Sequence, residues 1–239
     1  MVFQLRNFDL GRVLVITGAG ISADSGIPTF RGKDGYWRNL DPEKLATPQA
    51  FQANPQLVWQ WYSERREKIA NAMPNAAHLA LASLEKRAGE FLLVTQNVDD
   101  LHHRAGTSPE TLVQIHGDIF VSKCRSCGFS KPDRNTYESV PACPNCSDHL
   151  SPGVVWFGEQ LPEDGLLRIQ QFLDRGPCSL VLIIGTTARF GYIEEWARGQ
   201  RGRLIEINPG PVFADVADHV IRERASIAVP ILLSGIADG

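Results

Sequence analysis

The sequence lacks long hydrophobic runs and has little net charge. Its longest uninterrupted aliphatic stretch, residues 180–184, is far shorter than the ~18–20 residues that span a bilayer. The 24 basic and 27 acidic side chains leave a formal charge of −3, which provides no broad positive field for phosphate backbones or anionic lipids. We therefore expect no membrane helix and no direct binding of nucleic acid.

A signal peptide is also missing from the first ten residues, which mix apolar and charged side chains and offer no continuous apolar core. Cysteine is scarce, and the five cysteines are an odd number, which a complete disulfide framework would leave with one thiol over. The first feature predicts a cytoplasmic protein, and the second favours metal binding over disulfides.

Four of the five cysteines form two C-x2-C pairs, separated by residues 128–142. In each pair the intervening residues let the chain turn back, so that both sulfurs can reach one ion. The spacing predicts a structural zinc ribbon with four thiolate ligands, Cys124, Cys127, Cys143 and Cys146, and leaves no coordination position for water. Two disulfides are the alternative. We expect Cys178 to be a buried apolar residue outside this group.

Short apolar runs rich in β-branched residues recur along the rest of the chain, and most end in Gly, Asn or Asp. We expect them to be strands, at 12–17, 91–95, 180–184 and 203–207, with a weaker one at 112–115. Helix-like stretches at 76–87 and 166–173 lie between them. This alternation predicts an α/β fold with a Rossmann-like parallel sheet.

A glycine-rich turn follows the first expected strand. Residues 18–23 fit the pattern G-x-G-x-x-G/A, in which missing side chains let backbone N–H groups approach a pyrophosphate at the start of a helix. A tight turn without a ligand is the alternative. An ordinary dehydrogenase would carry an acidic residue ~20 positions onward at a strand end. Asp41 has about that spacing but lies in a Pro-containing segment without strand character, which argues against a dehydrogenase.

Two segments interrupt the alternation. Residues 33–77 hold a helix candidate at 55–70, and residues 121–150 contain the cysteine pairs and little apolar material. We expect them to form a small helical plus zinc-binding domain. Residues 1–32, 78–120 and 151–239 would then form the Rossmann-like nucleotide-binding domain.

Several blocks together resemble the sirtuin family of NAD-dependent protein lysine deacylases, most closely the bacterial-type members of class III. The blocks are residues 18–31, 95–99, 101–106, 116–117 and 154–159, together with the cysteine pairs. These blocks extend over nearly the whole chain and follow one another in the same order as in the family. The resemblance implies that NAD is consumed while an acyl group leaves a protein lysine, giving nicotinamide and O-acyl-ADP-ribose.

The resemblance also assigns residues to this reaction. It implies that His116 is the general base on the ribose hydroxyls, a role that suits imidazole because its pKa lies near working pH. It places Asn97 and Asp99 beside nicotinamide and ribose, and Phe30 and Arg31 on a loop over the cofactor. The other NAD contacts that it implies are Gly18, Ala19, Gly20, Ser22, Gln96, Gly185, Thr186, Thr187, Asn208 and Ala225.

For the acylated-lysine protein substrate, the resemblance implies a peptide-binding strand over residues 154–159. Its expected contacts are Val154, Val155, Phe157, Gly158 and Glu159, along which an extended peptide would add edge hydrogen bonds.

Tyr62 and Arg65 share one helical face and match the Y-x-x-R pair of class III sirtuins, and Ala46 matches their small pocket-widening residue. A phenol beside a guanidinium can bind a distal carboxylate, so we expect removal of succinyl or malonyl groups beside acetyl groups. A solvated charged helix face is the alternative.

Three positions depart from the family pattern. Asp24 replaces a usual Glu, Ser151 replaces a common Arg that could form a salt bridge, and residues 188–195 replace a valine and a Pro-Ala-Ala helix start. The last segment, from Arg189 to Tyr192 in particular, borders substrate and adenosine in the family. Two other functions therefore stay open: protein mono-ADP-ribosyl transfer, or a catalytically weak NAD-sensing interaction protein.

Overall fold

The computed structural model describes residues 5, 8–29, 41–187, 191–200, 202–210 and 216–235. The described residues include a six-stranded parallel sheet in the order β3-β2-β1-β7-β8-β9 and a three-stranded antiparallel sheet in the order β5-β4-β6. The order of the large sheet reverses direction at β1, as in doubly wound nucleotide-binding folds. The predicted α/β class with a Rossmann-like sheet is confirmed.

The strands of the large sheet agree closely with the apolar runs. They are β1 (Arg12–Thr17), β2 (Glu90–Thr95), β3 (Leu112–Gln114), β7 (Leu180–Ile184), β8 (Arg203–Ile207) and β9 (His219–Ile221). The central strands are buried on both faces, which explains their continuous apolar sequences. Strand β9 was not predicted, because it is a short edge strand with only half-buried side chains.

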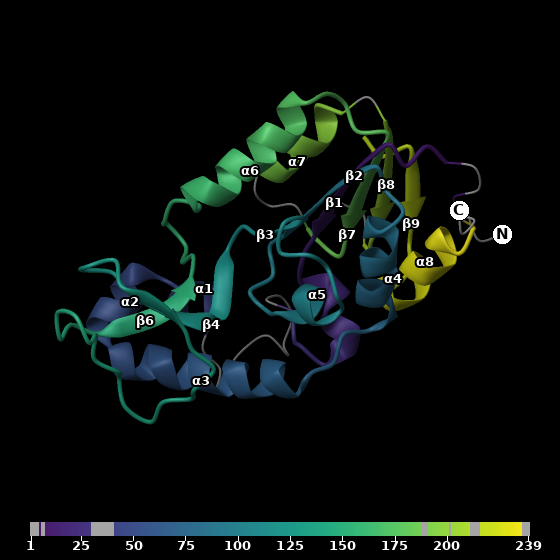
Figure 1. Ribbon diagram of the computed structural model, residues 1–239. Helices are drawn as coiled ribbons and strands as arrows, with labels where there is room; N and C mark the ends of the chain where they lie inside the picture. Colours follow the sequence, from purple (N-terminus) through teal and green to yellow (C-terminus); the bar gives the residue numbers. More distant parts are fainter. Residues whose placement is uncertain are drawn as a thin grey trace.

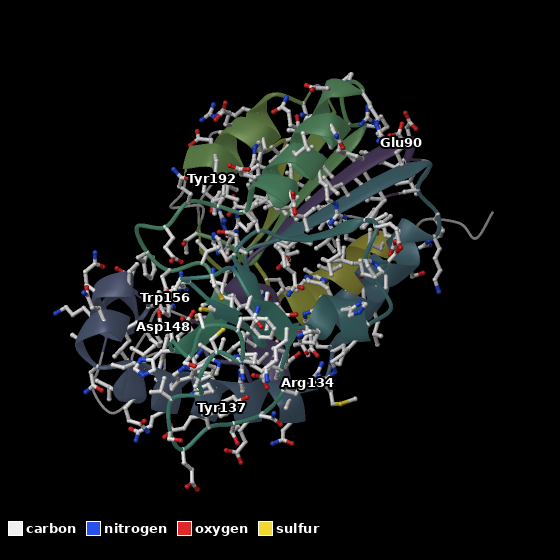
Figure 2. The ribbon with its side chains drawn as sticks, turned by 60° about the vertical axis from the view of Figure 1, so that its left-hand side comes forward. Glu90, Arg134, Tyr137, Asp148, Trp156 and Tyr192 are labelled. Carbon is white, nitrogen blue, oxygen red and sulfur yellow. The ribbon has the colours of Figure 1, made fainter. Side chains whose placement is uncertain are left out.

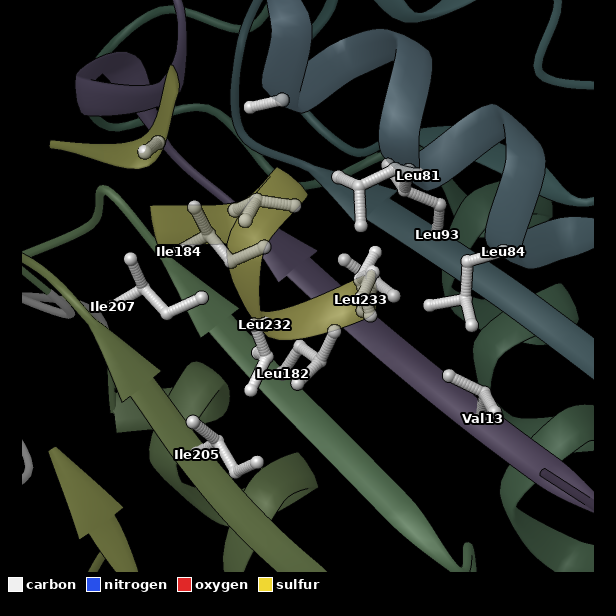
Figure 3. Packing of buried hydrophobic residues seen from close by; sticks show 14 of the residues in the cluster. Val13, Leu81, Leu84, Leu93, Leu182, Ile184, Ile205, Ile207, Leu232 and Leu233 are labelled. Carbon is white, nitrogen blue, oxygen red and sulfur yellow. The ribbon is translucent and has the colours of Figure 1, made fainter. Parts of the chain in front are cut away.

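Helices cover both faces of this sheet (Figure 1). On one face lie α4 (Ala76–Glu85) and α8 (Ala225–Leu233), and on the other lie α6 (Glu163–Asp174) and α7 (Gly191–Arg198). Figure 3 shows Val13 of β1 and the leucine and isoleucine side chains of β7 and β8 packed beneath α4 and α8. Among the apolar positions of the predicted 76–87 helix, Leu81 and Leu84 enter this core, whereas Leu79 is 54% exposed.

The smaller lobe combines helices with the antiparallel sheet. Its elements are α1 (Pro42–Leu45), α2 (Pro48–Ala53), α3 (Pro55–Asn71), β4 (Gly117–Cys124), β5 (Ser130–Pro132) and β6 (Leu150–Val154). Thr47 and Asn54 accept backbone hydrogen bonds as N-caps of α2 and α3, each just before a proline that fits the first helical turn. Strands β4 and β6 extend a few residues beyond the expected limits at 121 and 150.

Arg66 joins α3 to the antiparallel sheet. Its guanidinium is buried and donates hydrogen bonds to the carbonyl oxygens of Ile119 at 2.7 Å, Asn135 at 2.8 Å and Val121 at 2.9 Å. The carboxylate of Asp133 lies 3.8 Å away and balances the buried charge. The run of charged residues 64–68 is therefore only partly exposed to solvent. Polar contacts hold the small lobe together as well as its aromatic core.

Across the part of the chain that the structure describes, every helix is too short or too polar to cross a bilayer.

Candidate functional site

The turns that follow β1 and β7 touch through their backbones. The amide of Gly20 donates to the carbonyl of Gly185 at 2.8 Å, and the amide of Gly18 donates to the carbonyl of Ile184 at 3.0 Å. A Cβ on Gly20 would lie 2.7 Å from the Gly185 Cα, and Gly185 itself has φ 61°. Only glycine permits this approach. The helix predicted at this point is present only as two short 3-10 helices, Ala19–Ile21 and Ala23–Ser25.

A cavity of about 620 Å³ opens above these turns and reaches the small lobe. This size suits a nucleotide or another drug-sized ligand. Many residues predicted for NAD or peptide binding line it: Gly18, Ala19, Gly20, Ala46, Tyr62, Gln96, His116, Val154, Val155, Phe157, Gly158, Glu159, Gly185, Thr186 and Thr187. The structure therefore brings the expected cofactor residues and the expected substrate residues to one cavity.

Two predicted cofactor residues, Asn208 and Ala225, lie away from the large cavity, and two others are not among the described residues. Asn208 does not line the cavity but donates its side-chain amide to the carbonyl of Thr186 at 2.9 Å. Ala225 is buried at the start of α8 and lines no cavity wall described above. Phe30 and Arg31 lie outside the described residues.

A second, small cavity holds the other predicted catalytic groups. It is lined by Ser22, Arg65, Asn97 and Asp99, and it shares Ala19 and Val98 with the large cavity. The Asn97 amide donates to Ser22 Oγ at 3.1 Å and to the Gly18 carbonyl at 3.2 Å, and Ser22 Oγ donates to Asp99 Oδ2 at 2.9 Å.

This network fixes the direction of the Asn97 amide. Both of its hydrogen bonds use the Nδ2 donor, which leaves the carbonyl oxygen of the side chain for another partner. Burial raises the pKa of Asp99 to about 6, against the hydrogen bonds from Leu101 and Ser22, which lower it. Asn97 thus offers a hydrogen-bond acceptor, and Asp99 offers a carboxyl group whose pKa is near neutral pH.

His116 is oriented by two hydrogen bonds. Its Nδ1 lies 2.9 Å from the carbonyl oxygen of Gln96, and its Nε2 lies 2.8 Å from the hydroxyl of Tyr192. A carbonyl can only accept, so Nδ1 carries the proton and Nε2 presents a lone pair. Burial lowers the pKa of His116, with a smaller opposing effect from the Gln96 carbonyl. The imidazole is therefore neutral at pH 7 and able to act as a base.

The predicted peptide-binding strand over residues 154–159 is only partly a strand. Strand β6 ends at Val154, and the chain then turns, with Gly158 at φ 88° and the Glu159 amide donating to the Trp156 carbonyl at 3.0 Å. Phe157 donates its backbone amide to the carbonyl of Ala46 at 2.9 Å. The segment lines the large cavity as a turn because these hydrogen bonds tie it to the small lobe.

The pair Tyr62 and Arg65 is divided between the two cavities. Tyr62 lines the large one, where its hydroxyl accepts a hydrogen bond of 3.1 Å from Trp156 Nε1, and burial raises its pKa to about 12. Arg65 lines the small one, and burial lowers its pKa against the attraction of Tyr62 and Asp99. The guanidinium thus lies in an apolar, partly enclosed environment and not on a solvated helix face.

Arg125, which the sequence did not single out, links the first cysteine pair to the cavity wall. Its guanidinium forms an ion pair with Glu159, donates to Ser151 Oγ at 2.9 Å and lies 3.6 Å above the Trp156 ring. The expected loss of a salt bridge through Ser151 is thus offset, since Arg125 supplies a guanidinium at this place. Its position within the first C-x2-C pair was the one sequence feature that could have pointed to it. The sequence does not reveal its contact with Glu159, which depends on the fold.

The four cysteines fit a zinc ion. Their sulfurs all lie within 4.8 Å of one another, with Cys124 and Cys146 at 3.5 Å and Cys127 and Cys143 at 3.6 Å. Thiolates at ~2.3 Å from a tetrahedral zinc would lie about 3.8 Å apart. The predicted ligand set is therefore assembled, and a filled thiolate shell is suited to a structural role. Cys178 is buried in the main core, as predicted.

Comparisons with known proteins agree with this geometry. The Sir2 family model matches residues 18–190. An NAD-dependent protein deacylase of Leptospira interrogans serogroup Icterohaemorrhagiae serovar Lai is 43% identical, covering 95% of this chain and 94% of the relative. A protein of the same description from Pyrococcus furiosus is also 43% identical, covering 93% and 92%.

Two solved structures are also similar. A Sir2 homolog–NAD complex has a TM-score of 0.85 at 42% identity, covering 92% of this chain and 87% of that chain. A complex of Sir2 with a p53 peptide and NAD+ has a TM-score of 0.78 at 29% identity, covering 91% and 90%.

Replacing one thiolate should remove the metal. We expect Cys143→Ser to lower bound zinc from about one ion per chain to a small fraction, and to lower the midpoint of thermal unfolding, because the filled shell loses a ligand. Elemental analysis and a melting curve measure both effects. Cys178→Ala is the matched control and should keep its zinc. Full zinc content in Cys143→Ser would contradict the assignment.

Proposed function

Because the chain belongs to the Sir2 family, we propose that it is an NAD-dependent deacylase that removes acyl groups from lysines of proteins. The observation that carries this function is the shared cavity, in which the glycine turns, His116 and the turn at residues 155–159 meet. When bound, NAD would supply the ADP-ribose that receives the acyl group, with nicotinamide as the leaving product.

The glycine side of the cavity fits the dinucleotide. Gly18, Gly20 and Gly185 place no side chain between the backbone and a bound pyrophosphate. The Gln96 amide donates to Thr186 Oγ1 at 2.8 Å, so these two side chains hold each other at the edge of the cavity. Asn208 acts from outside by fixing the Thr186 carbonyl.

The residues of the small cavity suit the nicotinamide end by their chemistry, and the cavity of about 20 Å³ would have to widen to admit the ring. The side-chain carbonyl oxygen of Asn97 can accept a hydrogen bond from the ligand, and the Asp99 carboxylate can accept one from a carboxamide N–H. Ser22 holds both groups in place through its hydroxyl. These residues would orient the leaving group and exclude water from it.

His116 would take the proton from a ribose hydroxyl at Nε2. Nδ1–H donates a hydrogen bond to the Gln96 carbonyl, so the imidazole enters the reaction in the tautomer whose Nε2 is unprotonated. Burial keeps its pKa below the ordinary value, so the base form prevails at neutral pH.

The substrate would be an extended segment of an acylated protein beside residues 154–159. Solved structures of similar proteins contain a p53 peptide. In this chain Val154, Phe157 and Glu159 line the large cavity. Backbone hydrogen bonds would provide most of the affinity, and broad peptide choice would follow. The thiolate zinc shell suits the cytoplasm, where thiols stay reduced.

We also propose that the acyl pocket accepts succinyl and malonyl groups beside acetyl groups. Ala46 and Tyr62 line the large cavity, and Arg65 is close enough to Tyr62 and Asp99 for their charges to affect its pKa. Ala19 and Val98 border both cavities, so the two adjoin, and the proposed contact requires the Arg65 side chain to turn toward the acyl side. There it would bind a carboxylate with the help of the Tyr62 hydroxyl.

Product analysis tests the deacylase function. We expect mass spectrometry of reactions with NAD and acetyl-, succinyl- or malonyl-lysine peptides to show nicotinamide and O-acyl-ADP-ribose. His116→Tyr should lower turnover at least ~100-fold, because the base is lost, with zinc retained. ADP-ribose attached to protein, without an acylated product, would favour mono-ADP-ribosyl transfer instead. Nicotinamide release alone does not separate the two reactions.

The acyl preference has its own test. Arg65→Met should lower kcat/KM for succinyl and malonyl peptides about 100-fold, because a charge-assisted bidentate contact is lost, and should leave the acetyl peptide nearly unchanged. Lys68→Met, at an exposed position of the same helix, is the control and should affect no substrate. An equal loss on all three peptides would refute the carboxylate contact.

A further inference from the structure

The hydroxyl of Tyr192 engages the catalytic base. The segment that contains Tyr192 is where the sequence departs from the family pattern, and the function described above gives this residue no role. Tyr192 lies in α7, lines the large cavity and places its hydroxyl 2.8 Å from Nε2 of His116. In Figure 2, Tyr192 lies on the side of the sheet domain that faces Trp156 of the small lobe.

The direction of this hydrogen bond follows from the other nitrogen. Because Nδ1–H donates to the Gln96 carbonyl, Nε2 of the neutral ring can only accept, and the Tyr192 hydroxyl must donate. The phenol keeps its proton for this purpose, since burial raises the pKa of Tyr192 to about 12. The lone pair that would receive the ribose proton is therefore already engaged in the NAD-free protein.

The tyrosine ring is held in this position by its own helix. Its centroid lies 4.9 Å from that of Trp196, one helical turn further on, in a tilted arrangement. Both rings pack against the core beneath α7. The hydroxyl thus has a defined place beside the base.

We propose that the Tyr192 hydroxyl caps His116 Nε2 and must be displaced by a ribose hydroxyl before the base can act. This inference rests on the proposed function, because it concerns how that base meets NAD. The cap sets the apparent affinity for NAD: each binding event exchanges the phenol hydrogen bond for one from the ribose. A hydrogen bond of ordinary net strength reduces the affinity about two- to tenfold.

The cap also affects the imidazole in the absence of NAD. The ring nitrogens meet the Gln96 carbonyl just after β2 and the Tyr192 phenol on α7. A donor at Nε2 stabilises the neutral ring, so its removal should raise the pKa of His116.

The test compares Tyr192→Phe with Tyr137→Phe. The control removes a phenol hydroxyl that donates to Asp133 at 2.8 Å in the small lobe, away from His116. Calorimetry with NAD measures affinity, and NMR titration of the NAD-free proteins measures the His116 pKa, with His116→Asn used to assign the resonance.

We expect NAD to bind about two- to tenfold more tightly to Tyr192→Phe, and the His116 resonance to titrate at a higher pH than in the wild type. The control should match the wild type in both measurements. Unchanged or weaker NAD binding in Tyr192→Phe, or an unchanged titration, would overturn the cap. If the wild type forms O-acyl-ADP-ribose, either of these results refutes only the cap. If the wild type does not bind NAD, the proposed function is refuted as well.

Discussion

The backbone contact between the turns after β1 and β7 is the constraint on which the site depends. Gly20 and Gly185 hydrogen-bond directly, and there is no space for a side chain on either residue at their interface. This contact lies where the strand order of the sheet reverses, the place at which open α/β sheets bind ligands. The floor of the cavity is consequently made of peptide groups, which suit phosphate oxygens, while functional side chains enter from the rim.

The small lobe supplies the opposite wall, and polar groups determine its shape. Arg66 links α3 to the antiparallel sheet by hydrogen bonds. Arg125, within the first cysteine pair, contacts Glu159 and Trp156 and so couples the cysteines to the cavity wall. A zinc ion bound to the cysteines would therefore influence the acyl end of the cavity without touching a substrate. This separation explains how a structural metal could matter to an enzyme whose proposed catalytic residues, His116 and Asn97, lie away from the cysteines.

Local sequence signals predicted the parts of the fold that depend on local physics. Buried parallel strands read as apolar runs, and the cysteine spacing indicated the metal site. What failed depended on contacts between distant segments. The segment at 155–159 has the residues of a strand, but hydrogen bonds to Ala46 and within the turn bend it. Likewise, nothing near Tyr192 in the sequence reveals His116, which β3 and β4 bring to the same edge from far along the chain.

The most direct test of the account is NAD binding by Gly20→Ala, measured by calorimetry on protein that retains its zinc. The added Cβ would lie 2.7 Å from the Gly185 Cα, so the two turns must separate, and we predict at least about a tenfold loss of NAD affinity. Gly210→Ala, where a Cβ meets nothing within 4 Å, should bind like the wild type. Unchanged NAD affinity in Gly20→Ala would contradict the claim that the contact between these turns builds the nucleotide site.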